Sequence, residues 1–140
     1  MSGVLLDTHA LVWLMVGDGR LSPAVAEVVQ QAAATNQVYV SAITPWEIAM
    51  LVARNRLTFA SDIRTWLDQA LNQPGITLAP LIPAIAVDSV RLPGTIHGDP
   101  ADRIIVATAR YLRATLVTAD AKLLTYGRSG HVAVLDASSA

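Results

Sequence analysis

The sequence predicts an α/β protein, a three-layer α/β/α sandwich with a parallel central sheet. Two observations support this. Short, uniformly apolar segments alternate with helical patterns along the chain, and this alternation is typical of a parallel sheet with helices on both faces. The chain has 140 residues, a length at which one domain buries most of its apolar side chains. We therefore expect residues 1–140 to form a single domain.

The N-terminal half supplies the first two strands. "GVLLD" at 3–7 is short, apolar throughout and followed at once by a helical pattern that begins near Thr8, so it predicts a fully buried strand. "SPAVAEVVQQAAAT" at 22–35 begins with a capping serine and a proline in the first turn, which predicts a helix. "QVYVSA" at 37–42 predicts the second strand.

Two further helices follow in the middle of the chain. "TPWEIAMLVARN" from Thr44 repeats the combination of a capping residue and a proline. "SDIRTWLDQAL" from Ser61 has the pattern of a capped amphipathic helix. "GITLAP" at 75–80 then predicts a strand, and "PAIAVDSVRL" at 83–92 predicts a helix.

The C-terminal part repeats the alternation. "DPADRIIVATARYLR" at 99–113 predicts a longer helix, with Asp99 before Pro100 as its capping residue. "TLVTAD" at 115–120 predicts a strand, "AKLLTYG" at 121–127 a short helix and "VAVLD" at 132–136 a last strand.

The composition restricts the chemistry and the location. The absence of cysteine excludes disulfides and thiolate metal sites, and it favours a reducing cytoplasm. The longest uncharged apolar stretches, such as "HALVWLMVG", are too short to span a membrane. The net charge of −1 gives no overall attraction to nucleic acid. Any binding to phosphate would therefore need local arginines or bound cations.

The chain is more apolar than its own core requires. Hydrophobic residues make up 53% of the sequence and charged residues 15%, with a mean hydropathy of +0.45. Such an excess favours a buried partner surface. We expect a homodimer, and we assign the three tryptophans to the core or to this interface because no basic residues are interleaved with exposed aromatics.

Acidic residues follow the predicted strands. Asp7 ends the first strand and Asp120 follows "TLVT", while Glu47 and Asp102 fall in the first turns of two helices. The carboxyl ends of parallel strands form one edge of a sheet, where ligands bind. Carboxylates brought together there would repel one another unless a cation lay among them, and hard divalent metals such as magnesium or manganese suit such a cluster.

Each acid also has a purely structural interpretation. Asp7, Asp99 and Asp120 could each cap a helix, and Glu47 lies three residues after Thr44, the spacing of a capping box. Capping does not explain why these acids converge on a single edge of the sheet.

Four segments resemble the signature segments of PIN domains, in the order and spacing found in the VapC toxins of bacterial VapBC toxin–antitoxin pairs. They are "LLDTHALVWL", "SAITPWEIAML", "HGDPADRIIVATA" and "LVTAD". The resemblance covers residues 3 to about 136 and implies a metal-dependent endoribonuclease that acts on RNA phosphodiester bonds. It also implies a VapB-like antitoxin as partner.

The resemblance assigns catalysis and metal binding to an acidic quartet, namely Asp7, Glu47, Asp102 and Asp120. Asp99 would be a supporting acid, and Thr118 a hydroxyl close to the metal. In this interpretation bound Mg²⁺ or Mn²⁺ polarises a phosphodiester oxygen and activates a water that expels the 3′ oxygen.

Other residues near these motifs are weaker candidates. His9 and His97 are left out of the predicted site, because a histidine at a turn or helix end is more often structural. Arg103 and Arg110 lie seven residues apart on one helix and are candidates for phosphate contacts.

Three other functions would also place an aspartate after the first strand. A phosphatase of the haloacid dehalogenase type needs a second aspartate where His9 stands, and a phosphoaspartate receiver needs a paired acid beside its strand and a late lysine. Both fit poorly. A catalytically silent PIN-like scaffold or RNA-binding module stays as the alternative, although it would not need to keep all four acids.

Overall fold

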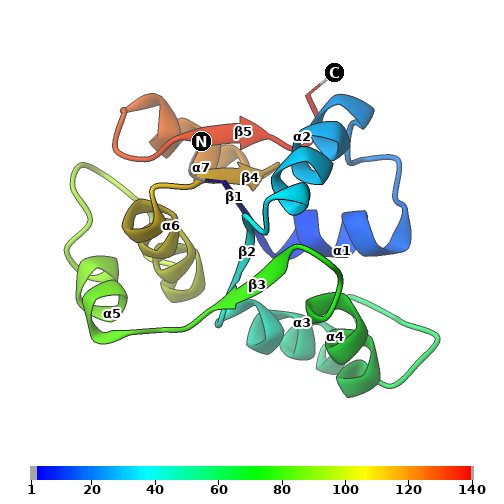
Figure 1. Cartoon of the computed structure of the whole chain (residues 1–140). Coiled ribbons are helices and arrows are strands. Elements are labelled where there is room, and N and C mark those ends of the chain that lie inside the picture. The colour runs from blue at the N-terminus through cyan, green and yellow to red at the C-terminus, as the bar shows by residue number, and fades with distance from the viewer. Residues whose placement is uncertain (1–2, 140) are drawn as a thin grey trace.

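The computed structural model describes residues 3–139, and its centre is a five-stranded parallel sheet with the order β3-β2-β1-β4-β5 (Figure 1). The strands are β1 (Val4–Leu6), β2 (Val38–Ser41), β3 (Ile76–Ala79), β4 (Thr115–Thr118) and β5 (Val134–Asp136). The helices are α1 (Thr8–Val16), α2 (Pro23–Ala34), α3 (Thr44–Ala53), α4 (Ile63–Leu71), α5 (Pro83–Ser89), α6 (Pro100–Leu112) and α7 (Ala121–Arg128).

Helices cover both faces of the sheet, which confirms the predicted three-layer sandwich. Figure 1 shows α1 and α2 on one side of β1 and α5 and α6 on the other. The alternation of β1 side chains explains this arrangement, because successive residues of a strand point to opposite faces. Val4 and Leu6 pack in a core cluster with α1 and α2, while Leu5 packs in a second cluster with α5, α6 and α7.

The central position of β1 fixes the site. Val4 pairs with Val38 of β2 on one side and with Thr115 of β4 on the other. Both neighbours run parallel to β1, so all three strands end at the same edge of the sheet. The residues that follow β1 and β4 therefore lie side by side.

The predicted helix starts are confirmed in part. Ser22 caps α2 by accepting a hydrogen bond from the Val25 amide, as expected. The cap of α4 is Asp62 and not Ser61, because the Asp62 carboxylate accepts from the Arg64 amide.

The capping interpretation of Thr44 and Glu47 is wrong. Ile43 precedes α3 without a side-chain cap, and Thr44 is already the first helical residue. The Thr44 side chain is fully buried and lies beside Thr8, with 3.4 Å between the two hydroxyl oxygens. Because the Thr44 hydroxyl is buried in the core, Glu47 has no capping partner there and is free to make another contact.

None of the helices within residues 3–139 has both the length and the apolar character needed to cross a membrane.

Candidate active site

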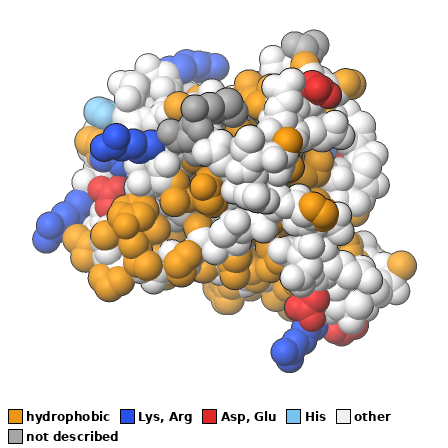
Figure 2. All heavy atoms as spheres, in the orientation of Figure 1, with side chains coloured by type: hydrophobic (Ala, Val, Ile, Leu, Met, Phe, Trp, Pro, Cys, Tyr) orange, Lys and Arg blue, Asp and Glu red, His pale blue; other side chains and the backbone are white. Residues whose placement is uncertain are grey.

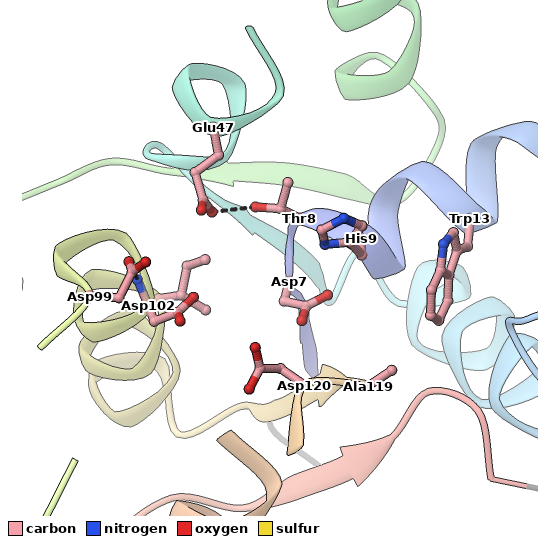
Figure 3. Close-up of a pocket in the computed structure, with 10 residues that line it drawn as sticks. Asp7, Thr8, His9, Trp13, Glu47, Asp99, Asp102, Ala119 and Asp120 are labelled. Atoms are coloured by element: carbon pink, nitrogen blue, oxygen red, sulfur yellow. Dashed lines mark hydrogen bonds between the residues drawn. The ribbon is translucent and has the colours of Figure 1, made fainter. Parts of the chain in front are cut away.

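An acidic pocket of about 370 Å³ opens at the carboxyl edge of the sheet (Figure 3). It contains every acid predicted for the site, and its lining is Asp7, Thr8, His9, Trp13, Glu47, Asp99, Asp102, Ile105, Ala119 and Asp120. Asp7, Glu47, Asp102 and Asp120 come from four different parts of the chain, and their carboxylates point toward one shared space (Figure 3). The structure therefore brings the predicted quartet together.

Asp7 caps α1 and also faces the pocket. Its Oδ1 accepts a 2.8 Å hydrogen bond from the Ala10 amide, and its Oδ2 accepts a short hydrogen bond from the Thr118 hydroxyl. The side chain is 7% exposed. This burial raises the pKa of Asp7, because a carboxylate loses hydration when it leaves water. Asp7 is therefore a helix cap through Oδ1, but capping does not explain why Oδ2 is bonded to Thr118 beside the pocket.

Thr118 connects Asp7 to Asp120. Its hydroxyl donates to Asp7 and accepts a 3.0 Å hydrogen bond from the Asp120 amide. Asp120 in turn caps α7, because its Oδ1 accepts from the amides of Lys122 and Leu123 at 2.8 and 3.2 Å. One buried hydroxyl therefore sets the spacing of two acids on neighbouring strands.

Glu47 is held by Thr8. The Thr8 hydroxyl donates to Oε1 of Glu47 over 2.5 Å, which joins the first turn of α3 to the first turn of α1. Burial raises the pKa of Glu47, and the charges of Asp102 and Asp99 raise it further. This acid has no capping role, so its burial is not explained by helix formation.

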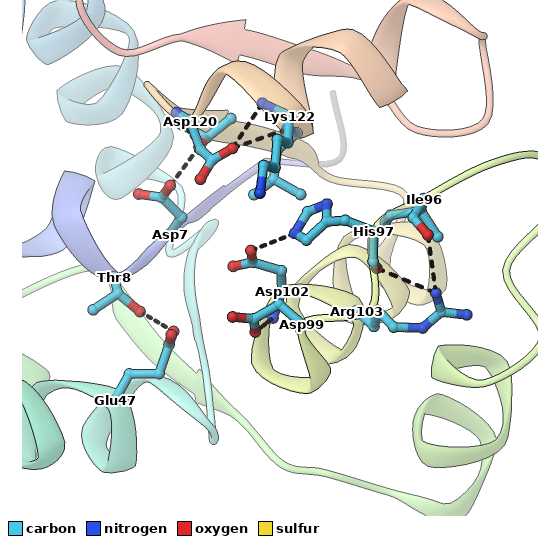
Figure 4. Close-up of polar contacts among 12 residues, drawn as sticks. Asp7, Thr8, Glu47, Ile96, His97, Asp99, Asp102, Arg103, Asp120 and Lys122 are labelled. Atoms are coloured by element: carbon cyan, nitrogen blue, oxygen red, sulfur yellow. Dashed lines mark hydrogen bonds and ion pairs between the residues drawn. The ribbon is translucent and has the colours of Figure 1, made fainter.

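The two aspartates of "HGDPADRIIVATA" have different roles. Asp99 is the N-cap of α6, since its Oδ1 accepts a 3.1 Å hydrogen bond from the Asp102 amide. The carboxylate of Asp102 faces the pocket instead, and its Oδ2 lies 2.7 Å from Nε2 of His97 (Figure 4). Burial raises the pKa of Asp102, although the hydrogen bond from His97 opposes the rise.

The pocket has a surplus of negative charge. Within residues 3–139, no lysine or arginine forms an ion pair with any of its acids. His97 lies against Asp102, and the charge of His9 lowers the pKa of Asp7 without offsetting the effect of burial. The charge of Asp102 adds to the rise in the pKa of both Asp7 and Glu47. Uncompensated carboxylates that repel one another are the donor set that a hard divalent cation prefers.

The residues fit such a cation chemically but are not closed around one. In the described part of the chain, no three histidine, aspartate or glutamate side chains are grouped closely enough to hold a metal ion as they stand. Side-chain rotations would have to draw the carboxylates together around an ion. The four acids of the quartet line one pocket, so such rotations would bring their carboxylates into a shared space (Figure 3).

Sequence reasoning missed two contacts in this site. Thr8 and His97 each hold one acid of the quartet. Thr8 stands directly after Asp7, and His97 stands five residues before Asp102. Their positions in the sequence indicated that both residues lie near the site, but not which acid each of them would bond.

The arginine candidates are engaged elsewhere. Arg103 donates to the carbonyl groups of Ser89, Ile96 and His97. Arg110 pairs with Asp88 at 3.1 Å and also donates to the carbonyl of His131. Both guanidinium groups therefore secure the loops around α6.

The tryptophans have separate locations. Trp13 is buried in the core and borders the acidic pocket, whereas Trp66 stacks on Phe59 with 4.2 Å between ring centroids. Trp46 is 53% exposed.

Comparison with known proteins identifies relatives along most of the chain. The PIN domain family model matches residues 4–128. Ribonuclease VapC22 of Mycobacterium tuberculosis (strain ATCC 25618 / H37Rv) is 34% identical over 126 residues, which cover 90% of this chain and 93% of the relative.

Two solved structures share the fold. VapBC2 from Rickettsia felis, bound to a DNA fragment from its promoter, matches with a TM-score of 0.69 and 18% identity over 94% of this chain and 96% of that one. FitAB bound to an IR36 DNA fragment matches with a TM-score of 0.67 and 21% identity over 98% and 96%. At this level of identity, the similarity establishes the architecture alone.

Proposed function

The chain belongs to the PIN domain family, and on that premise we propose that it is a metal-dependent endoribonuclease, the toxin of a type II toxin–antitoxin pair. The observation that carries the proposal is the convergence of four carboxylates on one pocket without a lysine or arginine paired to them in residues 3–139. The similarity to Ribonuclease VapC22 supports the choice of RNA as substrate.

The metal would be Mg²⁺ or Mn²⁺, held by the acidic quartet Asp7, Glu47, Asp102 and Asp120. When bound, such an ion stabilises charge on a phosphodiester oxygen and makes a water molecule a stronger nucleophile. In this proposal Asp7 and Asp120 would contact the ion directly. The Thr118 hydroxyl is hydrogen-bonded to both residues, and it holds them close together after the adjacent strands β1 and β4. Asp99 and Thr118 support them.

The residues of the chain bind and orient in this mechanism. Thr8 holds Glu47, and His97 holds Asp102, so both outer carboxylates stay directed at the pocket. A bond forms between the oxygen of a water and phosphorus, and the bond from phosphorus to the 3′ oxygen breaks. The attacking water gives up one proton to solvent, and the leaving oxygen takes one proton from solvent and becomes a 3′ hydroxyl. No side-chain nucleophile takes part.

Partner surfaces complete the proposal. Exposed apolar side chains gather over α5 and toward the edge strand β3 (Figure 2), and they include Leu78, Leu81, Val87 and Val90. This surface suits a homodimer, since exposed apolar area of this kind marks protein contacts. A VapB-like antitoxin is the second partner. With cellular RNA as its proposed substrate, we expect the toxin to act in the cytoplasm.

The test is RNA cleavage by the purified chain in the presence of Mg²⁺, Mn²⁺ or excess EDTA. We expect cleavage with either metal and none in EDTA, because the bound ion is what activates the attacking water at neutral pH. The Asp7→Asn variant serves as the inactive control. Full cleavage in EDTA would overturn the metal mechanism. Failure to cleave with any divalent metal would favour the silent scaffold.

A further inference from the structure

A second cavity lies beside the acidic pocket, between α7 and the loop that precedes α6. Its volume is about 560 Å³. The side chains that matter for its chemistry are those of Ile96, His97, Lys122, Thr125 and Ser129. We call this cavity the α7 groove.

Residues that line the α7 groove make hydrogen bonds to two acids of the acidic pocket, although no residue lines both cavities. His97 lines the groove and bonds Asp102, with 2.7 Å between Nε2 and Oδ2. Lys122 also lines the groove, and its amide donates to Oδ1 of Asp120 over 2.8 Å. Asp102 and Asp120 are therefore each in direct contact with a residue that lines the groove. These two contacts place the groove at the side of the acidic pocket where Asp102 and Asp120 lie.

The groove offers a cation where the pocket offers none. Lys122 is the single lysine of the sequence, and it forms no ion pair within residues 3–139. In Figure 4 its side chain extends from α7 toward the side of the pocket where His97 lies. Arg103, the nearest arginine in sequence to Asp102, is already bonded to three carbonyl groups. Lys122 is thus the charge available to an anion at this end of the site.

The remaining lining suits a sugar and a base. The Thr125 hydroxyl is exposed and forms no hydrogen bond to any other described residue, so it can donate to a phosphate or ribose oxygen. Ile96 adds an apolar surface against which a ring can lie. An ammonium, a free hydroxyl and an apolar wall together match one nucleotide of a single strand.

We propose that the α7 groove binds the nucleotide that flanks the scissile phosphate, with Lys122 contacting the next phosphate of the RNA. The inference rests on the proposed ribonuclease function and adds to it a location for the neighbouring substrate unit. It also explains how a chain of net charge −1 with an acidic pocket retains RNA, since a local cation counters part of the repulsion.

The first test measures binding without cleavage. A fluorescent RNA tetranucleotide is titrated in Mg²⁺ against the inactive Asp7→Asn protein and against the variants Lys122→Ala, Thr125→Trp and Arg128→Ala made in that inactive background. Arg128→Ala is the matched control, because it also removes one positive charge from α7 but lies outside the groove lining. We expect Kd to rise about fivefold for Lys122→Ala, the upper end for one exposed ion pair, and less than about twofold for the control.

Thr125→Trp separates the groove from the charge. A large ring placed in the groove should also weaken tetranucleotide binding while leaving the charge unchanged. Thermal melting checks that each variant folds. If Thr125→Trp does not fold, the comparison of Lys122→Ala with Arg128→Ala still decides the question.

The second test varies the substrate length. A dinucleotide contains the scissile phosphate but no flanking phosphate, so Lys122→Ala should lower kcat/KM for a tetranucleotide and leave that for the dinucleotide unchanged. An equal effect on both lengths would overturn the groove assignment, as would Lys122→Ala and Thr125→Trp binding as tightly as Arg128→Ala. In that case the wild type would still bind and cleave RNA, and the proposed function would stand. A wild type that neither binds nor cleaves would overturn both.

Discussion

Asp7 has two roles, one on each oxygen. Oδ1 accepts the Ala10 amide at the start of α1, and Oδ2 accepts the Thr118 hydroxyl. Either contact alone would justify an aspartate, but neither would justify a carboxylate that is 7% exposed and close to other acids. Burying a charge without an oppositely charged partner is unfavourable. The site therefore gives up some stability in the metal-free protein.

Asp7→Asn should separate stability from function. The amide oxygen can still accept the Ala10 amide, and the substitution removes both the buried charge and its repulsion by Asp102. We expect the metal-free variant to melt at the same temperature as the wild type or higher, and RNA cleavage to be lost. Thermal melts with and without Mg²⁺ check this. A marked drop in the melting temperature would show that Asp7 acts mainly as a cap.

The hydroxyl of the buried Tyr126 side chain leads us to predict that the protein loses stability at alkaline pH. Its hydroxyl donates to the Pro93 carbonyl over 2.6 Å, and burial raises its pKa above the ordinary value of 10.0. A raised pKa in the folded state means that the contribution is fully present below about pH 10 and is lost as the pH rises through the folded value.

The Tyr126→Phe variant isolates this contribution. It lacks the hydroxyl, so it should be less stable than the wild type at pH 7 by about 1 kcal/mol, the usual cost of one hydrogen bond. The difference should shrink above pH 10 in urea unfolding experiments. A difference that stays constant from pH 7 to 11 would contradict the assigned cause.

At the scale of elements, helix α6 shows how capping and function divide between neighbouring acids. Asp99 caps the helix through the Asp102 amide, while the Asp102 carboxylate turns to His97. The two aspartates are three residues apart but face different partners.

Substitution of each aspartate by asparagine tests this division. Asp99→Asn keeps a capping oxygen, so it should cost a few tenths of a kcal/mol and lower cleavage only in part. Asp102→Asn should change the stability by less than about 1 kcal/mol and abolish metal-dependent cleavage. Thermal melts and a cleavage assay on both variants provide the measurement. An inactive Asp99→Asn variant beside a fully active Asp102→Asn variant would show that Asp99, and not Asp102, is the metal-binding acid.

The same elements show what the sequence could predict. The strand at 3–7 and the helix from Ser22 were predictable, because apolar runs and capping residues act locally. The cap at Thr44 was not, since its hydroxyl is drawn into the core beside Thr8, 36 residues away in sequence. A local capping rule cannot include such a partner.

In the candidate site, too, the sequence predicted what local patterns and sheet topology determine, but not the contacts between distant residues. The position of acids after parallel strands predicted their convergence, because the topology of the sheet fixes that edge. The bond between Thr8 and Glu47 spans 39 residues and depends on how α1 meets α3. His97 lies in the loop before α6, whose path no periodicity describes. These contacts required the structure.

At the scale of the whole molecule, the apolar surplus is concentrated on part of the surface. Val90 is 73% exposed and lies at the end of α5, near Val87 at 46% and Leu81 at 45%. Single exposed apolar residues are ordinary, but a contiguous group of them is typical of a protein interface. The acidic pocket lies apart from this group, because none of these three residues lines it. A dimer formed here would leave the pocket available to RNA.

Sedimentation of two charged variants tests this surface. Val90→Asp places a carboxylate inside the proposed interface, where it would lose hydration without a partner, so a wild-type dimer should become monomeric at micromolar concentration. Val16→Asp is the control, because Val16 is 52% exposed at the end of α1 and belongs to a different part of the chain. We expect that variant to remain dimeric, and both to melt near the wild-type temperature apart from the stability that dimerisation itself contributes. A wild type that sediments as a monomer would remove the dimer, and a Val16→Asp variant that dissociates as readily as Val90→Asp would place the interface elsewhere.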